Sequence, residues 1–298
     1  MRKNKHTSDA IISGVIKVAG FSSILFIGLI LVFLLREGVP ILFKVPLNVL
    51  FSTTWYPIEG YFGILPLFLG TILVTIVAII ISLPFGIGTA VYISEIAPGW
   101  VKATLKPIIE ILAGIPSVVL GFIGIFVMVP FMRTFFNLPT GLTGLTGAIM
   151  LGLIAIPTVV SIAEDAMNTV PDSYRQAALA VGATKWQTIW GVTLPAAKTG
   201  VLTAVMLGVG RALGETMAVM MVTGNAPVMP TKYDSILRPL RTMTATIASE
   251  MGEVAQGSAH YEVLFFIGIV LFLLSLVINI AASSVSMKQR ARSERILS

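Results

Sequence analysis

Two charged side chains stand inside an otherwise apolar stretch of the sequence, GVGRALGETMAV, which runs from Gly208 to Val219. Arg211 and Glu215 are four residues apart, a spacing that places two side chains on one face of a helix. A charge at the centre of a membrane-spanning helix costs about 2.5–3.5 kcal/mol, so both charges must be paired, hydrated or both.

The two residue types have a common chemistry. A guanidinium group presents a rigid fork of donors that suits the oxygens of phosphate. Glu215 could pair with Arg211 when no anion is present, and it could accept a hydrogen bond from a phosphate P–OH, which sulfate lacks at neutral pH. This reading predicts an aqueous anion path lined by the pair. The alternative is an ion pair that only locks the helix against a neighbour.

The composition indicates which class of protein positions this pair. The chain has 298 residues, of which 56% are hydrophobic and 11% charged, against about 25% charged in soluble domains. Several apolar runs reach the roughly 20 residues that cross a bilayer as a helix. These features predict an all-α polytopic membrane protein. The net charge of +6 is typical of basic cytoplasmic loops and not a sign of nucleic-acid binding.

Metal and thiol chemistry have no basis in the sequence. The chain contains no cysteine, so it has neither a disulfide nor a thiolate site. Its two histidines, His6 and His260, lie far apart among polar residues and are expected to be solvated. No G-x-x-x-x-G-K-[ST] motif occurs, so we expect the chain not to bind ATP through a P-loop.

Six apolar runs predict six transmembrane helices. They cover about 11–35, 63–93, 108–132, 143–163, 199–222 and 263–286. The first run is too long for a signal peptide and is interpreted as a retained span. With the N-terminus inside, twelve lysines and arginines fall on the inner side and six on the outer side. This excess predicts that both termini are cytoplasmic.

Three regions follow from this topology. They are 1–62, with the N-terminus, the first span and an external loop; 63–287, the transmembrane domain with a cytoplasmic loop at about 164–198; and 288–298, a basic tail. Such a tail suits anionic lipid headgroups. Prolines within the spans, such as Pro116 and Pro157, predict kinks, and the many glycines of the spans predict close helix packing.

The cytoplasmic loop has clear helix punctuation. Ser173 with Gln176, and Thr184 with Gln187, have the spacing of capping boxes. Gly182 lies where a left-handed residue ends a helix. The prediction is two short helices, over about 174–181 and 185–193, that meet at Gly182.

The two predicted helices differ in their faces. The first has a small, smooth face and the second an apolar stripe. The first face comprises Tyr174, Ala177, Ala178 and Val181, and the stripe comprises Trp186, Ile189 and Trp190. The aromatic stripe could lie on lipid headgroups. The small face is better suited to docking in a groove of another protein.

The segment QAALAVGATKWQTIWGVTLP resembles the EAA loop of ABC-transporter permeases. Gln176 replaces the usual acidic residue, while Ala177, Ala178, Gly182 and the Leu-Pro that ends the segment fit the pattern. The resemblance implies that the loop docks in a nucleotide-binding subunit and transmits ATP-driven movement. That role falls on Gln176, Ala177, Ala178 and Gly182.

Two further stretches, GIPSVVLGFIG and GRALGETMAVMMVTGN, resemble phosphate-transport permeases, and more closely the PstC-type subunit than its PstA-type partner. The resemblance implies a type I ABC importer permease fold and import of inorganic phosphate across the cell (inner) membrane. It also places Arg211 and Glu215 on the family's R-A-L-G-E-T stretch. The implied partners are a second, PstA-like permease, a PstB-like ATP-binding dimer and a PstS-like phosphate-binding protein, with no cofactor on this chain.

Two other functions are open at this point. One is a permease for another oxyanion, sulfate or molybdate. The other is an intramembrane enzyme that uses Glu215 or Glu110 as an acid or base, for which no second catalytic group is evident. We therefore expect the chain to be a permease subunit and not itself an enzyme.

Overall fold

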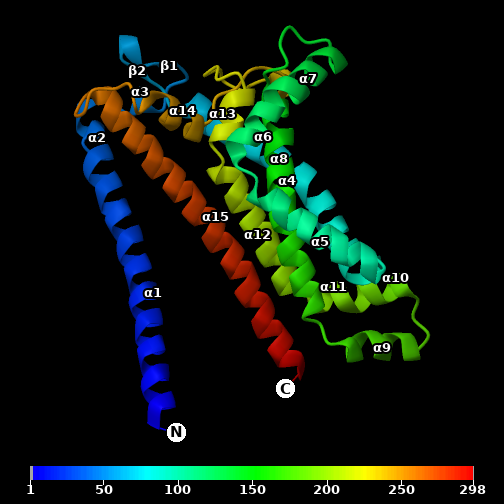
Figure 1. Ribbon diagram of the computed structural model, residues 1–298. Coiled ribbons are helices and arrows are strands. Elements are labelled where there is room, and N and C mark those ends of the chain that lie inside the picture. The colour runs from blue at the N-terminus through cyan, green and yellow to red at the C-terminus, as the bar shows by residue number, and fades with distance from the viewer. Residues whose placement is uncertain (1–2, 298) are drawn as a thin grey trace.

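The computed structural model describes residues 3–297, and long helices dominate it (Figure 1). The predicted all-α architecture is confirmed, with one small addition. The described residues hold a single two-stranded antiparallel sheet, formed by β1 (Trp55–Tyr56) and β2 (Tyr61–Phe62).

Among the described residues, five helical stretches are long and apolar enough to cross a membrane. They are built from α1 (Lys3–Gly38), α4 (Leu65–Val91) with the π-turn η2 (Tyr92–Ile96), α6 (Ser117–Ile123) with the π-turn η3 (Gly124–Met128) and α7 (Val129–Phe135), α8 (Gly144–Asn168), and α15 (Ala259–Leu297). A sixth span is reached only if the segments Lys185–Ala196 and Lys198–Gly214, bent by 73°, count as one. The predicted tail at 288–298 continues α15 to Leu297, and Ser298 lies outside the described residues.

Two predicted spans are not continuous helices. The third, expected over 108–132, is divided between α5 (Gly99–Gly114) and α6. The fifth, expected over 199–222, is divided between α12 (Lys198–Gly214) and α13 (Met217–Val222). The 17 residues of α12 extend only about 26 Å at 1.5 Å per residue, short of the roughly 30 Å of a bilayer core.

The centre of the bundle is α8, which packs against both α4 and α12. Glycine makes these contacts close. A Cβ on Gly86 of α4 would lie 2.8 Å from the side chain of Val159, and one on Gly208 of α12 would lie 2.5 Å from the same side chain. The predicted role of small residues in helix packing is confirmed at these positions.

Both described ends of the chain lie at one end of the bundle (Figure 1). The opposite end carries a cap of short elements around a buried apolar cluster that includes Ile41, Leu50 and Leu264. The cap comprises α2 (Ile41–Lys44), α3 (Leu47–Leu50), the hairpin with the 3-10 turn η1 (Pro57–Glu59), the 3-10 turn η5 (Tyr233–Leu237) and α14 (Met243–Glu250). Helices α1 and α15 are in contact near the cap and diverge toward the termini (Figure 1).

The loop after α8 lies at the same end as the termini (Figure 1). It contains α9 (Asp172–Ala180), α10 (Lys185–Thr188), the π-turn η4 (Ile189–Thr193) and α11 (Leu194–Ala196). The capping box of Thr184 with Gln187 is confirmed, and Gly182 has the expected left-handed φ of 86°. The box of Ser173 with Gln176 is wrong, because α9 begins earlier, directly after Pro171, without a side-chain cap.

Candidate functional site

Arg211 lies in the last turn of α12, beside the end of another helix. Its Nη2 donates a hydrogen bond of 3.3 Å to the carbonyl of Ala113, which belongs to the last turn of α5. The last four carbonyls of a helix lack partners within the helix and carry partial negative charge, so a cation is favourable there. The Nε–H of Arg211 is buried and has no hydrogen-bond partner.

Glu215 lies just beyond the end of α12, in extended backbone with φ −71° and ψ 125°. Its Oε1 accepts hydrogen bonds from the backbone N–H groups of Thr216, at 3.1 Å, and Ala218, at 3.4 Å. These donors belong to the start of α13, where negative charge is favourable. The side chain therefore caps the second half of the broken helix.

The expectation that Arg211 and Glu215 share one helix face is wrong, because the helix ends at Gly214. In the part of the chain that the structure describes, the two form no ion pair. Each charge instead interacts with the end of a helix. The structure thus gives no support to a direct ion-pair lock between them.

A second helix break lies next to this one. The backbone of Ile115 and Pro116 is extended between α5 and α6, as expected for a residue that precedes proline. Helix α6 then packs closely on α13, since a Cβ on Gly121 would lie 3.1 Å from the Cα of Ala218. Interrupted helices at membrane depth are found where backbone lines a cavity or is covered by protein, and their ends bind ions in transporters.

The residues of the predicted docking loop are divided between two sides of α9. Gln176 and Ala177 are exposed, as is Gly182, whereas Ala178 is buried against the rest of the chain. The predicted small face is therefore only partly available to another protein. Gly182 has open space around a hypothetical Cβ, so its requirement for glycine is a matter of backbone conformation alone.

The predicted aromatic stripe is also divided. Trp186 and Trp190 are exposed, but Ile189 is 2% exposed and belongs to a buried cluster with Ala163 and Met167 of α8. Ile189 is the first residue of the π-turn η4, so the regular helix of the stripe ends at this point. The loop is thus anchored on α8 while its tryptophans face outward.

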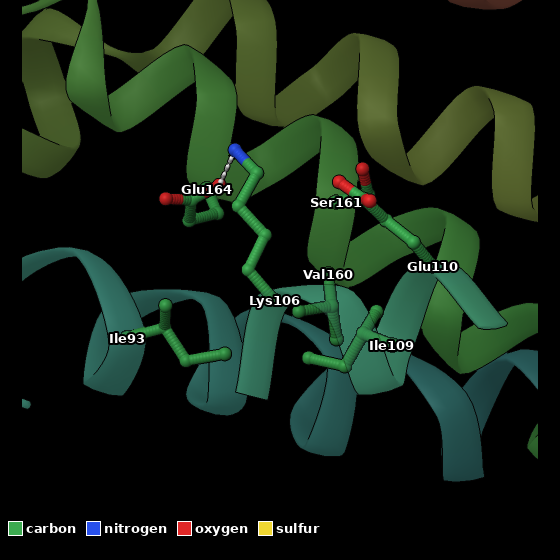
Figure 2. Close-up of a pocket in the computed structure, with 7 residues that line it drawn as sticks. All are labelled: Ile93, Lys106, Ile109, Glu110, Val160, Ser161 and Glu164. Carbon is green, nitrogen blue, oxygen red and sulfur yellow. Dashed lines mark hydrogen bonds and ion pairs between the residues drawn. The ribbon is translucent and has the colours of Figure 1, made fainter. Parts of the chain in front are cut away.

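A charged network was not predicted from the sequence. Lys106 of α5 reaches Glu164 of α8, with 2.8 Å between Nζ and Oε2 (Figure 2), and it also contacts Asp165 at 2.8 Å. The hydrogen bonds that Lys106 donates to Asp165, first, and to Glu164 raise the pKa of Lys106. Glu110, considered above as an acid or base, points toward Ser161 on the same side of α8 (Figure 2).

The cap holds another unpredicted group of polar side chains. Glu250 accepts hydrogen bonds from Trp55, at 3.2 Å, and from Arg241, at 2.5 Å. His260 Nε2 lies 2.8 Å from the other oxygen of Glu250. His260 was expected to be solvated, but it is partly buried in this network. No signal in the sequence joins residues so far apart.

The sequence profile of one family matches residues 82–290; its description is "Binding-protein-dependent transport system inner membrane component". The chain belongs to this family. Among its relatives is the probable ABC transporter permease protein YqgH of Bacillus subtilis (strain 168), 44% identical over 77% of this chain and 74% of that protein. The phosphate transport system permease protein PstC of Mesorhizobium japonicum is 33% identical over 96% and 92%.

Solved structures of the same fold are more distant. The MetNI methionine ABC transporter, in an inward-facing conformation, is 20% identical, with a TM-score of 0.59 over 74% of this chain and 93% of that one. A bacterial importer of alginate is 17% identical, with a TM-score of 0.57 over 90% and 98%. This member of the inner membrane component family therefore has the type I ABC importer permease fold, and its relatives include several PstC permeases.

Proposed function

We propose that this chain is the PstC-type permease subunit of an ATP-driven importer of inorganic phosphate. The observation that carries the proposal is the position of Arg211, between the end of α5 and the break after α12, with a buried Nε–H that has no partner. A free donor on a charged guanidinium suits an oxyanion. The names of the PstC relatives support phosphate as that anion.

Arg211 and Glu215 contact different groups of the bound phosphate in this proposal. The unpartnered Nε–H and the neighbouring Nη groups of Arg211 donate to two phosphate oxygens, displacing the 3.3 Å contact with Ala113. Glu215 uses Oε1 to cap α13, and its Oε2 makes no hydrogen bond to the described residues. Oε2 is free to accept from a P–OH of hydrogen phosphate. Sulfate carries no such proton at neutral pH, which favours phosphate over sulfate.

The chain works with other subunits in this proposal. A PstA-like permease completes the path across the cell membrane, and a PstS-like protein delivers phosphate from outside. A PstB-like dimer binds and hydrolyses ATP, so this chain is not itself the enzyme and carries no cofactor. The dimer docks on the exposed side of α9, at Gln176, Ala177 and Gly182, and both termini lie on that cytoplasmic side. Ala178 supports the loop from within.

The test is transport by the reconstituted complex. The chain is purified with its copurifying subunits, placed in lipid vesicles, and assayed for uptake of labelled phosphate with ATP supplied to the ATPase side. We expect phosphate uptake that excess sulfate or molybdate does not compete away. Uptake of sulfate or molybdate in preference to phosphate would contradict the proposal, and so would an ATPase activity that phosphate-loaded binding protein leaves unchanged.

A further inference from the structure

A single arginine connects the docking loop to two membrane spans. Arg175 of α9 contacts Glu95, which lies in the π-turn η2 at the end of α4. Its Nη2 donates to Oε1 of Glu95 at 2.8 Å, and its Nε lies 3.2 Å from Oε2. This paired contact of a guanidinium with a carboxylate is the strong, geometrically specific form of the ion pair. The Glu95 side chain is 7% exposed.

The same guanidinium also closes the end of α8. Its Nη2 donates to the carbonyl of Met167 at 2.9 Å, and its Nη1 donates to the carbonyl of Val170 at 2.6 Å. The carbonyl of Met167 also accepts from the backbone N–H of Val170 at 3.2 Å, and Val170 lies two residues beyond the end of α8. Arg175 thus adds a charged donor at a helix end, where a cation is favourable. The hydrogen bond to Glu95 raises the pKa of Arg175, whose guanidinium is in any case charged at physiological pH.

The contact of Arg175 with Asp172 differs from these. The distance from Nη1 to Oδ1 is 3.1 Å, but the Asp172 side chain is 85% exposed. Exposed pairs of this kind contribute little. The guanidinium is therefore held by the ends of α4 and α8 and not by its own helix.

We propose that Arg175 is a positioning residue that makes α9 move as one body with the ends of α4 and α8. The proposal rests on the proposed function, in which an ATPase pulls on the loop. Because Val159 of α8 packs directly on Gly208 of α12, movement of α8 reaches the helix that carries Arg211. Arg175 itself touches no substrate.

Without this contact α9 is connected to the spans through η4, whose Ile189 packs on α8, and through the chain itself. Segment Lys185–Ala196 leads into α12, but the two meet at an angle of 73°. A bent connection can absorb movement by changing its angle, whereas α4 and α8 are packed along their length. Removing the contact should therefore leave the ATPase docked and active but poorly coupled to transport.

The experiment compares Arg175→Gln, Arg175→Lys and Glu95→Gln with the control Asp172→Asn, all in the reconstituted complex. Membrane level, subunit copurification, ATP hydrolysis and phosphate uptake are measured for each. We expect normal assembly and hydrolysis, with phosphate moved per ATP reduced by roughly 5- to 150-fold, the usual range of coupling between two sites. Arg175→Lys should fail too, because an ammonium cannot present the fork. Asp172→Asn should resemble the unchanged protein.

Normal phosphate transport per ATP by assembled Arg175→Gln and Glu95→Gln complexes would overturn the proposal. Loss of all these variants from the membrane would also overturn it, since Arg175 would then serve folding alone. If the proposed function itself is wrong, the result differs from both of these outcomes, because the complex without any substitution would not take up phosphate.

The absence of cysteine permits a second test of the same idea. Glu95→Cys and Arg175→Cys are combined and joined by a bifunctional thiol reagent. If the ion pair acts as a mechanical link, joining the thiols should restore phosphate uptake per ATP relative to the unjoined double variant. A joined protein that stays uncoupled would show that a link between these positions is not what the ATPase requires.

Discussion

Replacing Arg211 by lysine separates a structural role from a role in the anion path. Lysine keeps a cation beside the end of α5, where Arg211 now contacts the carbonyl of Ala113. The favourable interaction with that helix end, about 0.3–1 kcal/mol, is therefore largely retained. Lysine cannot reproduce the planar fork whose buried Nε–H is unpartnered. We expect normal membrane levels and poor transport.

The size of the expected loss follows from the hydrogen bonds that disappear. A hydrogen bond to a charged group contributes about 1.5–3 kcal/mol, and each 1.36 kcal/mol changes a rate about tenfold. Losing one such bond to phosphate should slow uptake by roughly 10- to 150-fold. This loss exceeds anything expected from the helix end, so the two roles give distinguishable results.

The assay is the initial rate of labelled phosphate uptake in intact cells, corrected for the amount of each variant in the membrane. The double variant Arg211→Gln with Glu215→Gln serves as the companion. Glutamine at position 215 keeps the side-chain oxygen that caps α13, and the double change removes both charges from the span, so the double variant should reach the membrane. Its uptake should remain low because both contacts to phosphate are changed. Uptake within about twofold of normal by Arg211→Lys would refute the reasoning.

A cysteine at Ser173 should react with an impermeant thiol reagent only from the cytoplasm. A cysteine at Tyr233, which is fully exposed, should react only from outside. Reaction of both cysteines from the same side would contradict the topology. Gly182→Val places a β-branched residue at a φ of 86° and should cost about 1–3 kcal/mol locally, lowering uptake at normal membrane levels; normal uptake would argue against the loop's role. Ala177→Glu should assemble in the membrane without retaining the ATPase subunit, whereas Ala178→Glu, at a buried position, should lower the amount of folded protein. Retention of the ATPase subunit by Ala177→Glu would remove Ala177 from the docking surface.

Local patterns in the sequence predicted local structure well. The capping box of Thr184 with Gln187 and the left-handed Gly182 depend on neighbouring residues, and both are present. The expected helix start at Ser173 failed for the same local reason, since Pro171 begins the helix two residues earlier. The number of apolar runs and the permease fold followed from composition and from motif resemblance.

The arrangement of the site depended on contacts that no local pattern carries. The break after Gly214 leaves the carbonyl of Glu215 to accept from the Thr244 hydroxyl at 3.3 Å, a partner in the distant cap. Likewise, Arg175 meets Glu95 across 80 residues of sequence. A four-residue spacing predicts a shared face only while the helix continues, and the interruption at Glu215 depends on tertiary structure.

The three π-turns found within residues 3–297 determine where the chain can change in length. Tyr92–Ile96, Gly124–Met128 and Ile189–Thr193 each hold one residue more than a regular helical turn. Deleting a residue from a regular α-helix rotates everything beyond it by roughly 100°. Deleting the extra residue of a π-turn instead leaves a regular α-helical turn, so the helix beyond it keeps its direction. These three turns are therefore the points at which a helix of this protein can lose one residue without turning the faces that follow it.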